Sequence, residues 1–262
     1  MRNRVKTLAT LGAAVAMAGA AQAGPVIGQG TWEATLLGRD ISGNAVAASS
    51  SGAVFLYDKT LNVTWLRDTN YPKTSGYDAD GRMLRSTWIT WADSLTVGTF
   101  SGWRLPTMRD TGPSGCDYSQ SGGTDCGYNV QTKTGEPSKY VTGQTIYSEM
   151  AQLWYVELGN KAFYEPGTGT EQPGWGMSNT GSFQGLGGDY FWSGVAYAPD
   201  PANKSWAFGT PTGYQGYVYT DGPARALLVR DGDVAAVPEP ETCVFMLAGL
   251  GALVMVVRRK QG

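Results

Sequence analysis

Apolar residues along this chain come in short runs, separated by loops rich in Gly, Ser and Thr. Two such runs, residues 53–58 and 62–68, flank a three-residue turn, and this arrangement predicts a β-hairpin. Further short runs predict strands in the C-terminal part of the chain. They are residues 190–194, 205–209, 216–220 and 224–232.

Helical signals occur in two places. The sequence TWAD at residues 90–93 fits a capping box and predicts a short helix that ends at Leu95. This helix begins at Thr90 or already at Thr87. The clearest helix covers residues 148–159, where Ser148 can cap the first turn and the apolar positions share one face. The pattern therefore predicts two helices among many short strands.

The first 23 residues have the three parts of a secretory signal peptide. A basic start is followed by an Ala-rich apolar stretch and then by Ala21-Gln22-Ala23, a small-x-small cleavage signature. We predict cleavage between Ala23 and Gly24. Residues 24–52 are rich in small side chains, and this composition predicts a linker or an irregular entry segment.

The C-terminal tail, residues 234–262, ends in a short apolar stretch and a basic cluster. Residues 243–257 carry no charge, but fifteen helical residues span only about 22 Å, whereas a bilayer core is about 30 Å thick. The cations Arg258, Arg259 and Lys260 favour a cytoplasmic C-terminus. The tail therefore predicts a short membrane helix that holds a precursor in the inner membrane.

A motif precedes this helix. Pro238-Glu239-Pro240, the apolar stretch and the basic end together resemble the PEP-CTERM sorting signal of Gram-negative bacteria. The resemblance implies recognition by an exosortase-type peptidase, cleavage near the motif, and delivery to the cell envelope or the extracellular matrix.

Charge and composition narrow the function of the body of the chain. Residues 24–240 hold fourteen Lys and Arg against twenty-one Asp and Glu, a net charge of −7, which disfavours nucleic acid as a partner. The chain has no His, so the usual Ser-His-Asp and Cys-His arrangements and the favoured zinc ligand are missing. We predict a protein that is not an enzyme, with no catalytic residue, metal site or cofactor.

Two cysteines bracket a polar loop. Cys116 and Cys126 are separated by Gly- and Ser-rich sequence, and an oxidising compartment outside the cytoplasm permits a disulfide between them. Two thiols without His or further Cys nearby make a poor metal site. We predict a disulfide, which in the chain-entropy model adds about 3 kcal/mol of stability.

Sequence segments between residues 53 and 233 follow a characteristic order. They are YDKTLNVTWLRD, TWADSLTVGTFSGWRLPT, SEMAQLWYVELGN, YFWSG, KSWAFG and ALLVRDGD. In this order they resemble the Lcl C-terminal domain, which occurs in collagen-like bacterial adhesins and other exported proteins. The resemblance implies a loop-rich α+β fold of the C-type-lectin-like class, with two helices packed on small twisted antiparallel sheets. The cysteine loop interrupts a segment that is commonly one helix in that family.

Some residues admit both a structural and a binding interpretation. Trp103 and Arg104, in the sequence GWRLPT, fit a core residue and an ion-paired residue better than a binding site. The sequence DADG at residues 78–81 fits a turn better than a calcium loop. Aromatic residues near the predicted loops can be core residues or can stack on sugar rings. They are Trp175, Tyr190, Trp192, Trp206, Tyr214, Tyr217 and Tyr219.

These observations predict an exported, non-enzymatic protein that is anchored in the envelope or delivered to the matrix. Its expected role is adhesion or interaction with extracellular polysaccharide in a biofilm. Two alternatives stay open: a purely structural matrix protein without a specific ligand, and a glycosidase that uses a pair of carboxylates.

Overall fold

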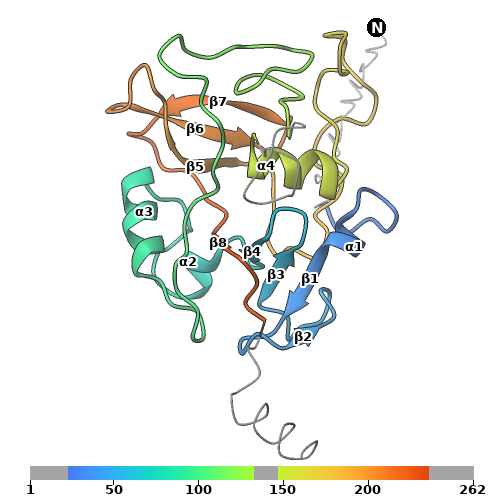
Figure 1. The fold of residues 1–262 in the computed structure, drawn as a ribbon, viewed down its shortest axis with the longest axis vertical. Coiled ribbons are helices and arrows are strands. Elements are labelled where there is room, and N and C mark those ends of the chain that lie inside the picture. The colour runs from blue at the N-terminus through green and yellow to red at the C-terminus, as the bar shows by residue number, and fades with distance from the viewer. Residues whose placement is uncertain (1–22, 133–146, 236–262) are drawn as a thin grey trace, which may run out of the picture.

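The computed structural model describes residues 23–132 and 147–235 and has two antiparallel sheets with a few short helices (Figure 1). The five-stranded sheet has the order β2-β1-β3-β4-β8. Its strands are β1 (Leu36–Arg39), β2 (Ala45–Val46), β3 (Phe55–Asp58), β4 (Val63–Leu66) and β8 (Val229–Asp231). The three-stranded sheet consists of β5 (Tyr190–Ala196), β6 (Lys204–Gly209) and β7 (Tyr214–Tyr219).

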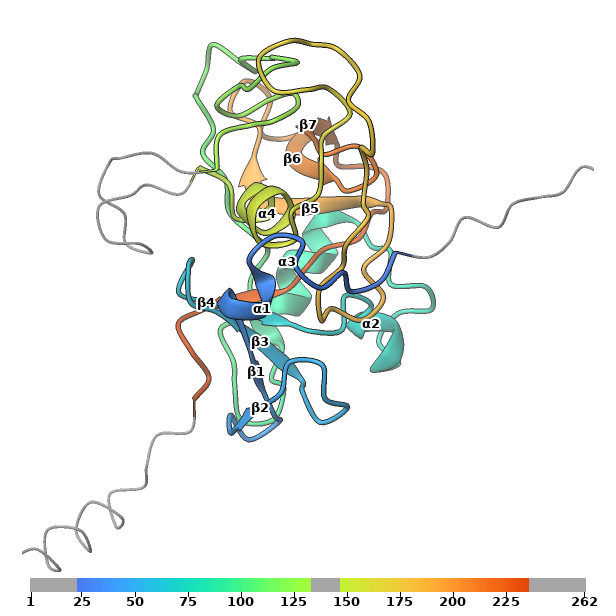
Figure 2. The ribbon, with the colours of Figure 1, turned by 90° about the vertical axis from the view of Figure 1, so that its right-hand side faces the viewer.

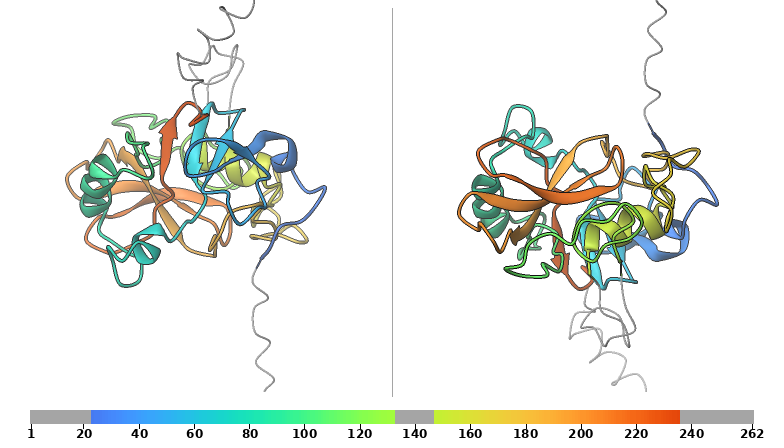
Figure 3. Two further views of the ribbon diagram at one scale, coloured as in Figure 1. Left: turned by 90° about the horizontal axis from the view of Figure 1, so that it is seen from below. Right: turned by 90° about the horizontal axis from the view of Figure 1, so that it is seen from above.

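The helices are short. They are α1 (Trp32–Thr35), α2 (Tyr71–Thr74), α3 (Arg85–Ser94) and α4 (Glu149–Ala151), which continues as the π-helix η1 (Gln152–Glu157). Figures 2 and 3 show that α3 and the α4–η1 helix lie at different places beside the sheets. The coarse expectation of a loop-rich α+β fold with antiparallel sheets is confirmed.

The predicted hairpin of residues 53–68 is present as β3 and β4. Leu56 lies opposite Trp65, and Phe55 lies opposite Leu66. The first pair packs into a core that includes the α4–η1 helix, and the second pair packs into a core that includes α3. Both faces of the hairpin are therefore covered, which explains why its apolar residues do not alternate with polar ones.

The C-terminal strand segment joins the two sheets. Arg225 forms a parallel bridge with Phe191 of β5, and four residues later Val229 pairs with Trp65 of β4. Residues 224–232 were predicted as one continuous strand, but only Val229–Asp231 form β8. The segment is divided because its two ends hydrogen-bond to different sheets.

Helix α3 differs from its prediction at the N-terminus. It begins at Arg85, its N-cap is Leu84, and no side chain caps it, so the capping box predicted for residues 90–93 is wrong. Burial explains the earlier start. The side chain of Trp88 is fully buried and its Nε1 donates to the carbonyl of Ala224 at 2.9 Å, which a helix beginning at Thr90 would not place.

The second predicted helix is confirmed with its cap. The Ser148 hydroxyl accepts a hydrogen bond from the backbone N–H of Ala151 at 3.1 Å. Its remaining turns are π-helical, which the periodicity did not indicate. The side chain of Leu158, just beyond η1, is fully buried.

Residues 24–52 were expected to be a linker or an irregular entry segment, whereas the structure places α1, β1 and β2 within them. Trp32 and Leu36 are 6% and 1% exposed and pack in the same core as Trp65. Four residues of β1 pair with β3. The sequence signal for these elements is weak because most residues in this segment are small and its few core positions are widely spaced.

The predicted signal peptide, except its last residue, and the predicted sorting tail beyond residue 235 lie outside the described residues. Within the ranges that the structure describes, no helix has the length and apolar character needed to cross a membrane.

Candidate functional site

The GWRLPT segment is a structural joint. Trp103 is 3% exposed and stacks on Phe55 with 5.6 Å between ring centroids. Arg104 donates through both terminal nitrogens to the buried carboxylate of Glu149, each at 2.8 Å, and also to Asp231 at 2.6 Å. Burial opposes the charge of Arg104, but these two carboxylates outweigh it and raise the pKa of the guanidinium. The structural interpretation of this motif is therefore supported.

The predicted disulfide between Cys116 and Cys126 is present, with 5.4 Å between the Cα atoms. Two aspartates inside the loop fix its backbone. Asp117 accepts hydrogen bonds from the N–H groups of Thr124, Asp125 and Cys126. The Asp125 carboxylate in turn accepts from the N–H of Asp117. The loop is thus a rigid support for the side chains that it presents.

The DADG sequence forms a turn. One oxygen of Asp78 accepts hydrogen bonds from the N–H groups of Asp80 at 3.0 Å and Gly81 at 2.7 Å. Across residues 23–132 and 147–235, no group of three or more Cys, Asp or Glu side chains is arranged to hold a metal ion.

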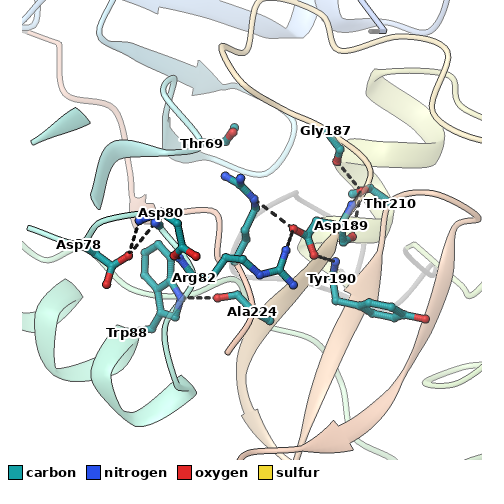
Figure 4. Close-up of polar contacts among 12 residues, drawn as sticks. Thr69, Asp78, Asp80, Arg82, Trp88, Gly187, Asp189, Tyr190, Thr210 and Ala224 are labelled. Carbon is teal, nitrogen blue, oxygen red and sulfur yellow. Dashed lines mark hydrogen bonds and ion pairs between the residues drawn. The ribbon is translucent and has the colours of Figure 1, made fainter. Parts of the chain in front are cut away.

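An arginine–aspartate cluster lies beside this turn (Figure 4). Asp189 pairs through one carboxylate oxygen with Arg82 and with Nε of Arg225, the latter at 3.1 Å, and its other oxygen accepts from the N–H of Tyr190. The Tyr190 ring points away from the cluster in Figure 4. The cluster links the turn to the start of β5 and to the segment that joins the sheets.

The seven aromatic residues singled out from the sequence divide into three groups. Trp192 and Trp206 are buried core residues. Tyr217 and Tyr219 lie on β7, where the Lys204 ammonium is 5.0 Å from each ring centroid. The other three are partly exposed: Trp175 lies in a loop, and Tyr190 and Tyr214 are the first residues of β5 and β7.

Trp175 and Tyr214 belong to a continuous row of rings that we call the aromatic surface. Successive ring centroids are 4.8 to 6.4 Å apart, and every ring is at least partly exposed. Tyr118 and Trp175, at the two ends, are 53% and 39% exposed. In order, the row consists of Tyr118, Tyr214, Tyr128, Tyr164, Phe163 and Trp175.

Two loops build the aromatic surface together with β7. The disulfide loop, taken together with the residues that follow it as far as residue 130, and the loop at residues 160–175 lie side by side in Figures 1 and 2. The N–H of Gly167 donates to the carbonyl of Ser121, and the Asn129 side chain donates to the carbonyl of Tyr164 at 2.7 Å. These bonds hold the two loops together, so the surface does not depend on one flexible segment.

A glycine positions the ring from the sheet. A Cβ atom on Gly216 would come within 2.5 Å of the Tyr214 ring, so the absence of a side chain lets this ring lie on β7. Tyr214 can then contact both Tyr118, inside the loop closed by the disulfide, and Tyr128, two residues after Cys126.

A groove with both polar and apolar lining residues borders the aromatic surface. It has a volume of about 460 Å³, and Asn129, Lys161 and Gln172 are among the residues that line it. These residues come from the same two loops as the aromatic rings. Amide groups next to exposed rings can hydrogen-bond hydroxyl groups of a ligand whose apolar face stacks on the rings.

Four of the six rings were not identified from the sequence: Tyr118, Tyr128, Phe163 and Tyr164. Each lies in a Gly-rich loop without a strand or helix pattern. The only local signal was the concentration of aromatic residues within such loops, because a large apolar side chain in a flexible segment needs packing partners.

Two carboxyl groups interact in the core. The side chains of Asp58 and Glu157 are fully buried, and Asp58 accepts hydrogen bonds from the N–H of Leu61 and from Trp65 Nε1. Burial first, and then the charge of Asp58, raise the pKa of Glu157 to about 9. This pair lies in the core, where a polysaccharide chain has no access, so its burial does not favour the glycosidase alternative.

Comparison with known proteins identifies only the tail. Residues 236–260 match the family model of the PEP-CTERM protein-sorting motif. No curated protein and no solved structure shows significant similarity to the chain. The motif implies an exported protein that is sorted to the cell surface and processed by an exosortase.

Proposed function

We propose that the mature protein is a non-enzymatic polysaccharide-binding protein of the cell envelope or extracellular matrix, and that it binds through the aromatic surface. The observation that carries this proposal is the unbroken row of six partly exposed rings on loops held by a disulfide. Sugar rings present apolar C–H faces, and a row of aromatic rings provides several successive stacking positions.

Two further observations support this role. The sorting motif implies delivery to the cell surface, which is where a protein that binds exopolysaccharide would act. The order of motifs that resembles the Lcl C-terminal domain, with the C-type-lectin-like fold that it implies, agrees with a protein used in adhesion. The body is acidic, which favours neutral or weakly charged polysaccharides over strongly anionic ones.

The test replaces the two most exposed rings of the surface, Tyr118 and Trp175, with Ala. We expect each change to weaken binding to a retained bacterial polysaccharide by about fivefold to tenfold, since one stacking contact contributes about 1 kcal/mol. Binding is measured on a polysaccharide array and then by affinity electrophoresis.

Tyr77→Ala is the matched control, because Tyr77 is also 53% exposed but stacks on Trp91 of α3, outside the aromatic surface. Its binding is expected to equal that of the unmodified protein. If the unmodified protein binds no polysaccharide on the array, the structural-matrix alternative replaces this proposal.

A further inference from the structure

A second pocket lies near the N-terminal end of the described chain and shares no residue with the aromatic surface. It is formed by α1, β1, the turn at residues 48–49 and the segment at residues 181–183, and it has a volume of about 460 Å³. Trp32, Leu36 and Phe183 contribute apolar walls. Its size lies in the usual range of small-molecule sites.

A buried cation lines this pocket. Arg67 is 6% exposed and is the one arginine among the buried residues that the structure describes. Its guanidinium donates only to backbone carbonyls: Nε to Ser182 at 2.8 Å, and Nη1 to Ser50 at 2.6 Å and Ala53 at 2.9 Å. In the described ranges no carboxylate lies within ion-pair distance of Arg67.

One nitrogen of this guanidinium has spare donor capacity. Nη2 has a single long contact, 3.5 Å to the carbonyl of Ser49, and Ser49 also lines the pocket. A buried charge that is balanced only by carbonyl dipoles is stabilised further by an anion within hydrogen-bond distance. Burial lowers the pKa of Arg67, which is the expected effect of a charge without a counter-ion.

A second polar group in the pocket has no partner. Ser182 is 6% exposed, and its hydroxyl makes no hydrogen bond within the described structure. An unsatisfied buried hydroxyl costs about 1–3 kcal/mol. The hydroxyl oxygen is itself buried in the pocket wall, so the Ser182 side chain must rotate toward the pocket before one ligand acceptor can satisfy both this hydroxyl and Nη2 of Arg67.

We infer that this pocket binds a small monocarboxylate whose carbon body is about the size of one ring. The carboxylate pairs with Arg67 and Ser182, and the ring lies against Trp32 and Phe183. A single charge is favoured over phosphate because Glu33, also in the lining, repels a second negative charge. This binding is separate from polysaccharide binding at the aromatic surface.

Two ligand sources share this chemistry: free apolar carboxylates and the uronic acid units of acidic sugars. Isothermal titration calorimetry of the exported protein with benzoate and with glucuronate distinguishes them. Benzamide and glucose, which lack the charge, serve as the neutral counterparts. We expect benzoate, glucuronate or both to bind with at least a tenfold preference over the neutral counterpart.

Two variants test whether the carboxylate binds in this pocket. Ser182→Ala removes a hydroxyl that has no partner, so we expect unchanged or higher thermal stability together with at least fivefold weaker carboxylate binding. Ala48→Phe adds volume to the lining and is expected to abolish binding without altering the contacts of Arg67. A circular dichroism melt reports whether each variant is folded.

The inference is overturned if neither carboxylate binds at millimolar concentration, if the neutral counterparts bind equally well, or if both variants bind as the unmodified protein does. Polysaccharide binding by Tyr118→Ala and Trp175→Ala is measured separately, so failure of one proposal leaves the other intact.

Discussion

Single residues in this protein owe their properties to their surroundings. Arg104 and Arg67 are both largely shielded from solvent, yet Arg104 is held by two carboxylates and Arg67 only by carbonyl groups. The first arrangement is a closed structural joint. The second leaves a buried charge without a carboxylate partner in the described structure, and the inferred carboxylate site rests on this difference.

Glu157 gives a pH-dependent prediction at this scale. Its pKa is about 9 in the folded protein against an ordinary value of 4.5, so the unfolded chain loses its proton first as pH rises. The stability from this group is full below pH 4.5 and is lost as pH rises toward 9. One oxygen of Glu157 accepts from Thr35 at 3.0 Å, and the other accepts from no described donor, which fits a protonated oxygen beside Asp58.

We expect the free energy of unfolding to fall by on the order of 4 kcal/mol between pH 5 and pH 8 because of this residue, at about 1.4 kcal/mol per pH unit. Glu157→Gln, which keeps the shape but cannot ionise, should remove most of that slope. Urea denaturation at several pH values measures it, with the exposed Glu165→Gln as control. If the unfolding free energy of Glu157→Gln depends on pH as strongly as that of the unmodified protein, the pH dependence does not come from Glu157.

At the scale of elements, strand β7 links the sheet to the aromatic surface. Tyr214 begins this strand and lies on Gly216, where an added Cβ would overlap its ring. We expect Gly216→Ala to displace the Tyr214 ring and to weaken polysaccharide binding by about fivefold, the effect of one lost stacking contact. The cost in stability should be about 1 kcal/mol, because a ring can move more easily than backbone.

Gly222→Ala is the control for this change, because an added Cβ there meets no atom within 4 Å. Affinity electrophoresis and thermal melts of both variants make the comparison. Equal polysaccharide affinity in Gly216→Ala and the unmodified protein would exclude Tyr214 from the binding surface.

At the scale of the whole molecule, the sorting motif decides where the folded body is delivered. Replacement of Pro238, Glu239 and Pro240 by Ala should leave uncleaved precursor in the inner membrane, because the exosortase loses its recognition sequence. Immunoblotting of inner-membrane, envelope and culture fractions measures the distribution. Thr242→Ala, a change just after the Pro-Glu-Pro sequence, serves as control, and normal release of the triple variant would refute processing that depends on this sequence.

The sequence by itself determined the features that depend on neighbouring residues. The hairpin of β3 and β4, the cap at Ser148 and the disulfide between Cys116 and Cys126 follow from contiguous patterns and short spacings. The sorting motif is of the same kind, because it is a contiguous sequence, residues 236–260.

Only the tertiary structure decided the features that join distant segments. Leu36 gives no strand signal of its own, yet it lies in the five-stranded sheet because β3 offers it a partner and the core buries it. Arg67 meets Ser182, 115 residues away, and the aromatic surface brings Tyr118 to Tyr214. Such contacts depend on how loops fold back onto the sheets, and local propensity carries no information about that choice.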